Sequence, residues 1–223
     1  MIVITRKEFP RDAKIKCLLW SDRHCCLCGR QCGTNIEIAH IDKNEPAVLK
    51  NAIPLCFDCH AKIGHYRDEH PLGNKYQADE LISRREQVYE TFTSHLVPRI
   101  DFQVVQRSKF PDVGFQFIHL GGPYPARLRV KVEVILGDKN IGVLRDQYDG
   151  NHVWNLNPGY RFYGHTNLPK ETVESTERLE LDTTITIVDR YQREHKLLPM
   201  AHVYDRRRQS WFAEPCPFID KKL

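Results

Sequence analysis

The clearest hydrophobic pattern in the chain is strict alternation in its second half. In RLRVKVEVIL, residues 127–136, apolar side chains at every second position alternate with Arg129, Lys131 and Glu133, which predicts a strand with one buried face. Further strands are predicted at Val113–His119, Ile141–Leu144, Tyr160–Leu168, Leu179–Asp189 and Lys196–Tyr204. Turn residues separate them, so we expect an antiparallel β-sandwich of immunoglobulin-like architecture, without the Cys, Trp, Cys spacing of a true immunoglobulin domain.

The first part of the chain has a helical pattern instead. A helix is predicted over residues 10–22, with Ile15, Leu18 and Leu19 on its packing face. A second is predicted over residues 78–96, with Arg84 and Arg85 off its apolar stripe. Val97-Pro98-Arg99 then ends the helix. The chain is therefore predicted to be α+β, with a first domain over residues 1–98 and an all-β domain over residues 99–223.

Composition adds chemistry to the first domain. It holds seven of the eight cysteines and six of the eleven histidines of the 223 residues. The net charge of +4 permits contact with nucleic acid without requiring it. No apolar run reaches the roughly 18 residues needed to span a bilayer, and the N-terminus lacks the h-region of a signal peptide. We expect a soluble, cytoplasmic protein that makes no membrane contact and whose paired cysteines bind metal.

Two CxxC pairs carry the strongest chemical signal. Cys25 and Cys28 are followed, after 27 intervening residues, by Cys56 and Cys59. A CxxC turn presents two thiolates from one tight loop, and two such turns can complete a tetrahedral zinc site. The pairs are predicted to hold a structural Zn²⁺. The neighbouring Cys26 and Cys32 form no matching pair, but either could substitute for a ligand, and Cys17 is expected to be a buried core thiol.

Between the pairs, residues 36–41 (IEIAHI) alternate like a strand. Strict alternation puts His40 on the face of Ile36 and Ile38, where a histidine is more often a core residue than a catalyst. Residues 42–50 are expected to form a polar loop, and Asn51 follows it. A helix can begin near Cys59 and would carry His60.

These residues together resemble the HNH endonuclease family, which has the ββα-metal fold. The resemblance rests on the order CxxC, A-H-I and N-x-I-P-L-C-x-x-C-H, followed by a G-x-Y, an H-P-x-G and an E-L-x-x-R-R, and it covers residues 10–96. The His, Asn and His of the family name correspond to His40, Asn51 and His60. The resemblance implies a zinc-stabilised domain that hydrolyses phosphodiester bonds.

It also implies a role for each of the three. His40 would be the general base that activates water, and an imidazole with an ordinary pKa of about 6.5 suits this work. Asn51 would hold the imidazole or its loop in place, or would ligate the catalytic metal. His60 would be a ligand of a catalytic Mg²⁺ or Mn²⁺ ion.

One position departs from the family pattern. Many members have a metal-binding Asp immediately before the first His, where this chain has Ala39. Glu37, two residues earlier on the same strand face, is the first candidate to supply the missing carboxylate, and the alternative is a solvated strand residue. Asp58, His65 and His70 are the next candidates.

The leading hypothesis is therefore a metal-dependent endonuclease that cuts DNA and serves in restriction or antiphage defence. The β domain would recognise nucleic acid or a trigger, and a homodimer is compatible with cleavage of both strands. One alternative, motivated by Ala39, is a catalytically weak or inactive zinc-stabilised module that binds nucleic acid or protein. A second is a nuclease that cleaves RNA. Trp154, Tyr160, Phe162 and Tyr163 either line a binding surface or belong to the β core.

Overall fold

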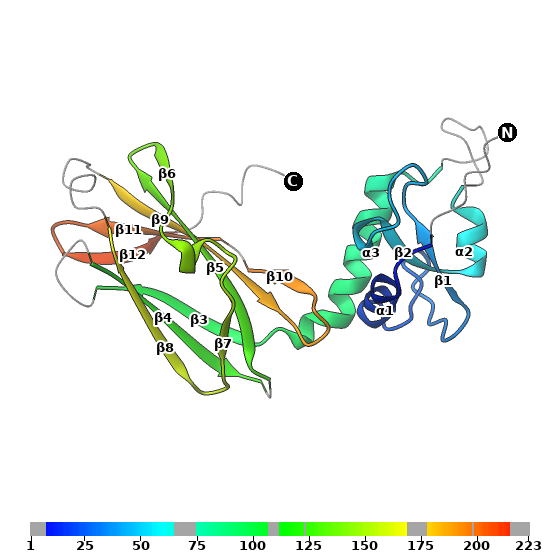
Figure 1. Cartoon of the computed structure of the whole chain (residues 1–223), viewed down its shortest axis with the longest axis horizontal. Coiled ribbons are helices and arrows are strands. Elements are labelled where there is room, and N and C mark those ends of the chain that lie inside the picture. The colour runs from blue at the N-terminus through cyan, green and yellow to red at the C-terminus, as the bar shows by residue number, and fades with distance from the viewer. Residues whose placement is uncertain are drawn as a thin grey trace. The chain divides into compact units, whose positions relative to one another are not determined.

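The chain divides into two compact units with different secondary structure (Figure 1). The computed structural model describes residues 8–64, 75–106, 112–122, 124–168, 178–197 and 199–214. Unit 1 is Met1–Leu96 and unit 2 is Val97–Leu223. The α-helices lie in unit 1, and most of the strands lie in unit 2. In the described part of the chain, no helix is long and apolar enough to cross a membrane.

Unit 1 packs helices around a two-stranded antiparallel sheet. Its elements are α1 (Arg11–Trp20), β1 (Ile36–His40), the 3-10 turn η1 (Leu49–Asn51), β2 (Ala52–Cys56), α2 (Phe57–Lys62), α3 (Ala78–Thr93) and the 3-10 turn η2 (Ser94–Leu96). β1 and β2 pair from Ile36 opposite Cys56 to His40 opposite Ala52. Every residue of β2 is buried, so this strand is the centre of the unit.

The packing face of α1 differs from the one predicted. Ile15 and Leu19 are 46% and 41% exposed, whereas Ala13 and Cys17 are buried. Helix α1 contacts β2 and α3. Small side chains four residues apart let the helix lie close to both elements, whereas two large aliphatic residues would hold it away. The prediction of a packing face is therefore wrong for Ile15 and Leu19, whereas Leu18 is half-buried. The prediction of a buried thiol at Cys17 is confirmed.

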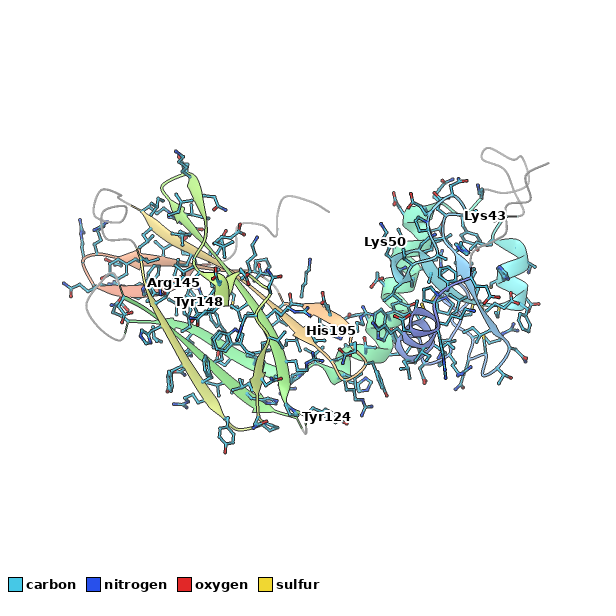
Figure 2. The ribbon with its side chains drawn as sticks, in the orientation of Figure 1. Lys43, Lys50, Tyr124, Arg145, Tyr148 and His195 are labelled. Atoms are coloured by element: carbon cyan, nitrogen blue, oxygen red, sulfur yellow. The ribbon has the colours of Figure 1, made fainter. Side chains whose placement is uncertain are left out.

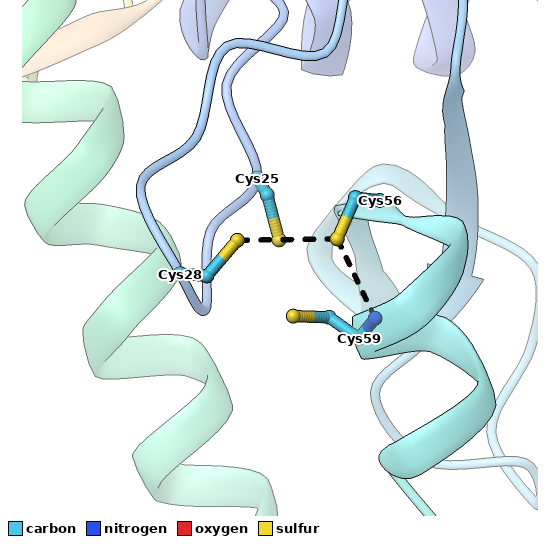
Figure 3. Close-up of side chains that lie close together, drawn as sticks. All are labelled: Cys25, Cys28, Cys56 and Cys59. Carbon is cyan, nitrogen blue, oxygen red and sulfur yellow. Dashed lines mark hydrogen bonds between the residues drawn. The ribbon is translucent and has the colours of Figure 1, made fainter.

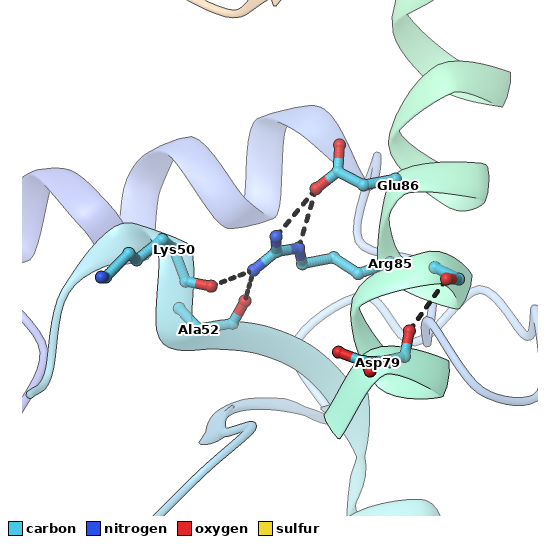
Figure 4. A network of polar contacts seen from close by, with 6 residues as sticks. Lys50, Ala52, Asp79, Arg85 and Glu86 are labelled. Carbon is cyan, nitrogen blue, oxygen red and sulfur yellow. Dashed lines mark hydrogen bonds and ion pairs between the residues drawn. The ribbon is translucent and has the colours of Figure 1, made fainter. Parts of the chain in front are cut away.

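Helix α3 also corrects a prediction, because Arg85 belongs to its buried face. Its guanidinium Nη1 donates hydrogen bonds to the carbonyl oxygens of Lys50 at 2.7 Å and of Ala52 at 3.0 Å (Figure 4). Nε and Nη2 donate to the Glu86 carboxylate. The apolar periodicity missed Arg85 because this side chain is buried to donate hydrogen bonds to backbone carbonyl groups where η1 meets β2. A hydropathy pattern contains no information about such hydrogen bonds.

We expect Arg85→Ala to lower the free energy of unfolding of unit 1 by about 2 to 4 kcal/mol, because two carbonyl groups lose a charged donor. Urea unfolding followed by the helical circular dichroism signal measures this. Arg84 is the matched control, since it is exposed and pairs with Glu80 one turn away. Arg84→Ala should change stability by less than about 0.5 kcal/mol. Equal effects of the two substitutions would contradict the assignment.

Unit 2 consists of two antiparallel sheets. The larger has the order β12-β11-β9-β5-β6, with β10 beside β9 and β7 beside β5, and the smaller has the order β3-β4-β8. The strands are β3 (Arg99–Val105), β4 (Asp112–Gly121), β5 (Ala126–Leu136), β6 (Lys139–Val143), β7 (Trp154–Leu156), β8 (Arg161–Asn167), β9 (Leu179–Val188), β10 (Glu194–Lys196), β11 (Met200–Asp205) and β12 (Ser210–Glu214). A 3-10 turn, η3 (Asp146–Tyr148), lies between β6 and β7.

The inward faces of the two sheets share one hydrophobic core, as in a β-sandwich. Leu128, Val130, Val132 and Val134 of β5 are each at most 4% exposed, which confirms the predicted face of this strand. Phe102, Phe115 and Phe117 of the smaller sheet belong to the same core. The sequence pattern missed β3, β7, β10 and β12. β7 and β10 have three residues each, and β3 and β12 lie at sheet edges, where partial burial gives only a weak alternation of apolar and polar residues. The immunoglobulin-like topology stays a prediction.

Tyr148 fills the interior of this core (Figure 2). Its side chain is 1% exposed, and the ring stacks obliquely on Phe115 with centroids 4.7 Å apart. The hydroxyl lies against the backbone of β8 at Gly164, where an added Cβ atom would stand only 2.5 Å from it. Glycine is therefore required at position 164 by packing against a rigid aromatic side chain.

Gly164→Ala should destabilise unit 2 by about 1 to 3 kcal/mol, because the new methyl group overpacks the core. Gly121→Ala is the control, since a Cβ atom there meets nothing within 4 Å. Thermal unfolding of both variants tests this. Adding Tyr148→Phe to Gly164→Ala removes the clashing hydroxyl and should restore part of the loss; no restoration would contradict this packing account.

Candidate metal centre and adjoining pocket

The first cysteine pair lies at the tip of a tight hairpin. His24 and Gln31 form an antiparallel bridge, and the Cys25 amide donates to the Arg30 carbonyl at 2.9 Å. Gly29 completes the turn with a φ of +69°, a conformation that favours glycine. The sequence C-x-x-C-G therefore folds into a loop that presents the sulfur atoms of Cys25 and Cys28.

The second pair lies where β2 ends and α2 begins. Cys56 is the N-cap residue of α2, and its sulfur accepts a hydrogen bond from the Cys59 amide at 3.4 Å. The Cys26 amide donates to the carbonyl of Pro54 at 3.0 Å, which ties the first hairpin to β2. Arg30 of the hairpin also pairs with Asp58 of α2 at 2.8 Å. Backbone and side-chain bonds thus bring the two pairs together.

The four cysteines form a cluster that can hold a zinc ion (Figure 3). The sulfur atoms of Cys25, Cys28, Cys56 and Cys59 all lie within 4.8 Å of one another, and those of Cys28 and Cys56 are 3.9 Å apart. Zinc–sulfur bonds of about 2.3 Å in a tetrahedron place sulfur atoms about 3.8 Å apart. The donor set and its spacing therefore fit Zn²⁺, and four thiolates would leave the ion no open position.

The remaining described cysteines have other surroundings. Cys17 is fully buried, and Cys26 is 3% exposed in the core of unit 1. Burial raises the pKa of both thiols. Cys32 donates its S–H to the Arg30 carbonyl at 3.1 Å. None of the three belongs to the cluster of close sulfur atoms.

The surroundings of Cys56 favour its thiolate. Burial opposes ionisation, but hydrogen bonds from the Cys59 amide and from neighbouring side chains, Arg30 among them, outweigh it and lower the pKa of Cys56 to about 6. Burial raises the pKa of Cys28 and Cys59. Zinc binding would therefore release protons, as is general for thiolate sites.

A pocket of about 420 Å³ in unit 1 brings three of the predicted site residues together. Glu37 and His40 of β1 and His60 of α2 line it, together with Glu8, Phe9, Lys14, Leu18, Ile36 and Ile38. Ile36, Ile38 and His40 are only half-buried, so the strand face predicted to point into the core forms a pocket wall instead. The ring of Phe9 packs on the His40 imidazole with centroids 4.2 Å apart.

Glu37 and His60 contact each other in the pocket wall. A Glu37 carboxylate oxygen contacts His60 Nδ1, and both side chains are partly exposed. This contact joins β1 to the helix that begins at the second cysteine pair. A carboxylate and an imidazole held together can serve as oxygen and nitrogen donors for a divalent cation.

Asn51 organises the loop that follows His40. Its amide nitrogen donates to the carbonyl oxygens of Asp42 at 2.8 Å, Pro46 at 3.1 Å and Glu45 at 3.2 Å. Its oxygen accepts from the Asp42 amide at 2.8 Å. Asn51 is 5% exposed and does not line the pocket. Asn51 was predicted either to hold the imidazole or its loop in place or to ligate the catalytic metal. These hydrogen bonds fit the role of holding the loop.

The other sequence candidates lie elsewhere. Ala39 is 2% exposed and packs in the core beside Cys25 and Ile53, so the residue at this position does not line the pocket. Asp58 pairs with Arg30 and is also outside the pocket lining. His65 and His70 lie outside the described residues.

Sequence reasoning missed three residues that line the pocket, Glu8, Phe9 and Lys14. Phe9 precedes α1 and is 5% exposed, and Lys14 is half-buried on α1. Neither has a sequence signal that connects it with His40, because the helix approaches β1 through tertiary packing alone. The Phe9 ring limits how the His40 imidazole can rotate, and Lys14 adds a positive charge.

No protein-family model matches the chain, and no curated protein does. Among solved structures, a protein from Bordetella pertussis with the provisional name ApaA aligns with 14% identity and a TM-score of 0.33, covering 47% of this chain and 94% of that one. The structural genomics target SoR45 aligns with 13% identity and a TM-score of 0.29, covering 46% and 83%. Similarity this low assigns neither a family nor a function.

The purified protein should contain about one zinc ion per chain by elemental analysis. Cys28→Ser should lower zinc affinity by more than about 100-fold, since even changes beside a metal ligand cost about 10- to 100-fold. Cys32→Ser is the matched control and should keep its zinc. Two ions per chain, or equal losses in both variants, would contradict the ligand assignment.

Proposed function

We propose that the protein is a metal-dependent endonuclease of the HNH type that hydrolyses phosphodiester bonds in DNA. One observation carries the proposal: Glu37, His40 and His60 line a single pocket beside the four-cysteine cluster. The order of elements supports it, because the β1–β2 hairpin is followed directly by α2, the succession after which the ββα-metal fold is named. The cysteine cluster would be structural, with Zn²⁺ as its ion.

Glu37 and His60 would hold the catalytic divalent cation. Mn²⁺ accepts mixed carboxylate and imidazole ligation, and Mg²⁺ would complete its coordination with water. When bound, such an ion polarises the phosphate and stabilises the leaving oxygen. A Glu37 carboxylate oxygen contacts His60 Nδ1, so a bound cation would replace this contact with one bond to each side chain.

His40 would remove the proton from the attacking water. A base for this step must have a fixed orientation. Phe9 packs on its ring from one side, and the Asn51 carbonyl accepts the Ile41 amide at 2.9 Å, which holds the backbone that follows His40. Asn51 would thus act on the reaction through the position of His40.

The burial of Ala39 bears on the alternative, a binding module without catalysis. That alternative was motivated by the absence of a carboxylate at position 39, but the side chain there packs in the core while Glu37 reaches the pocket. The pocket therefore has a carboxylate of its own. Unit 2 would recognise nucleic acid or a trigger, and pairing of two chains would allow both DNA strands to be cut.

Cleavage of plasmid DNA with Mn²⁺ or Mg²⁺ tests the proposal. His40→Ala should slow cleavage by about 10²- to 10⁴-fold, the usual contribution of a general base. His60→Ala should remove the Mn²⁺ heat signal in calorimetry while zinc content stays unchanged. His95→Ala, at an exposed position of the turn η2, is the control and should cleave normally.

If the wild-type protein cut neither double-stranded nor single-stranded DNA, or if His40→Ala cut at the wild-type rate, the proposal would fail. Matched DNA and RNA substrates separate the two nuclease hypotheses, because hydrolysis of the phosphodiester does not itself distinguish the sugars. Retained DNA binding with no hydrolysis and no Mn²⁺ site would favour the binding module instead.

A further inference from the structure

Lys14 supplies a positively charged side chain to the pocket. It lies on α1 in the turn before the buried Cys17, and it is the only lysine or arginine among the described residues that line the pocket. The other polar residues of the lining are two glutamates and two histidines. A phosphodiester that enters a pocket with these carboxylates needs a cation to offset repulsion between like charges.

The Glu8 carboxylate pairs with the Lys14 ammonium group. Its Oε2 atom is 3.1 Å from Lys14 Nζ, and the Glu8 side chain is 87% exposed. Ion pairs this exposed are weak, because water screens them and ordering two long side chains costs entropy. A phosphate group can therefore replace the carboxylate at the ammonium with little loss.

We propose that Lys14 binds a phosphate group of the nucleic acid strand that enters this pocket, and that Glu8 competes with that phosphate. The inference rests on the proposed function, which brings a phosphodiester to His40. Lys14 and His40 line the same pocket, so one strand can contact both. Lys14 would position the strand through charge, and it would carry no information about base sequence.

The experiment measures binding of a short double-stranded DNA oligonucleotide at several salt concentrations, without added divalent cation so that no cleavage occurs. Lys14→Gln should weaken binding at every concentration and should lower the slope of log K against log salt by about 0.9, the value for one lost phosphate contact. Lys16→Gln is the matched control, because Lys16 lies on the same helix but does not line the pocket.

A double-mutant cycle tests the role of Glu8. Glu8→Gln should tighten binding about two- to fivefold, since it frees the ammonium from a weak exposed pair. The same substitution should have no such effect in the Lys14→Gln background. Asp12→Asn removes a negative charge from α1, the helix of Lys14, at a position that does not line the pocket. This variant controls for the change in net charge. Zinc content checks that every variant is folded.

The outcomes separate this inference from the proposed function. If the wild-type protein cleaves DNA while Lys14→Gln binds and cleaves like wild type, the Lys14 inference fails and the nuclease proposal stands. If cleavage is absent but the slope falls only for Lys14→Gln, the phosphate contact stands and the nuclease proposal fails. Additive effects of Glu8→Gln and Lys14→Gln would overturn the competition, and absence of DNA binding would overturn both proposals.

Discussion

The close approach of four sulfur atoms is the constraint on which unit 1 depends. Helix α2 has six residues and β1 and β2 have five each, so none of these elements would be stable alone. The hairpin of Cys25 and Cys28 and the turn of Cys56 and Cys59 meet at the point where β2 becomes α2. An ion held there would stabilise the junction by much more than the short elements contribute themselves.

The same junction sets the geometry of the pocket. His60 follows Cys59 directly, so its place on α2 is tied to the four-cysteine cluster, while Glu37 and His40 are placed by the pairing of β1 with β2. Arg85 of α3 supports β2, because its guanidinium donates to the carbonyl groups of Lys50 and Ala52, where η1 meets β2 (Figure 4). The cysteine cluster and the pocket are thus built from neighbouring residues of one short segment.

Unit 2 is built on a different principle, alternation of side chains along paired strands. β5 and β9 pair over ten residues each, and their inward faces form the middle of the core. The turn before β10 is held by a buried carboxylate: Asp189 pairs with His195 at 2.9 Å and accepts hydrogen bonds from the amides of Tyr191 and Arg193. Burial raises the pKa of Asp189, but these hydrogen bonds outweigh it and hold the pKa below its usual range.

The sequence by itself determined the features that depend on local chemistry or on a regular period. The spacing of the CxxC pairs predicted the cysteine cluster, and strict alternation predicted the buried face of β5. Both features can be recognised in the sequence because a metal-binding loop needs particular ligands at a fixed spacing, and because the side chains of a strand alternate between its two faces every two residues. Glu37, His40 and His60 were identifiable as candidates for one site through the family resemblance, but the pocket residues Phe9 and Lys14 were not.

Tertiary structure alone decided which helix faces are buried and which residues share the pocket. Helix α1 packs through Ala13 and Cys17, although Ile15 and Leu19 are more hydrophobic, because close approach to β2 requires small side chains. Lys14 lies on the neighbouring face of that helix and so reaches the pocket. Contacts between segments far apart in sequence are determined by the fit of side chains and by the need to pair buried polar groups. Neither requirement produces a periodic pattern in the sequence.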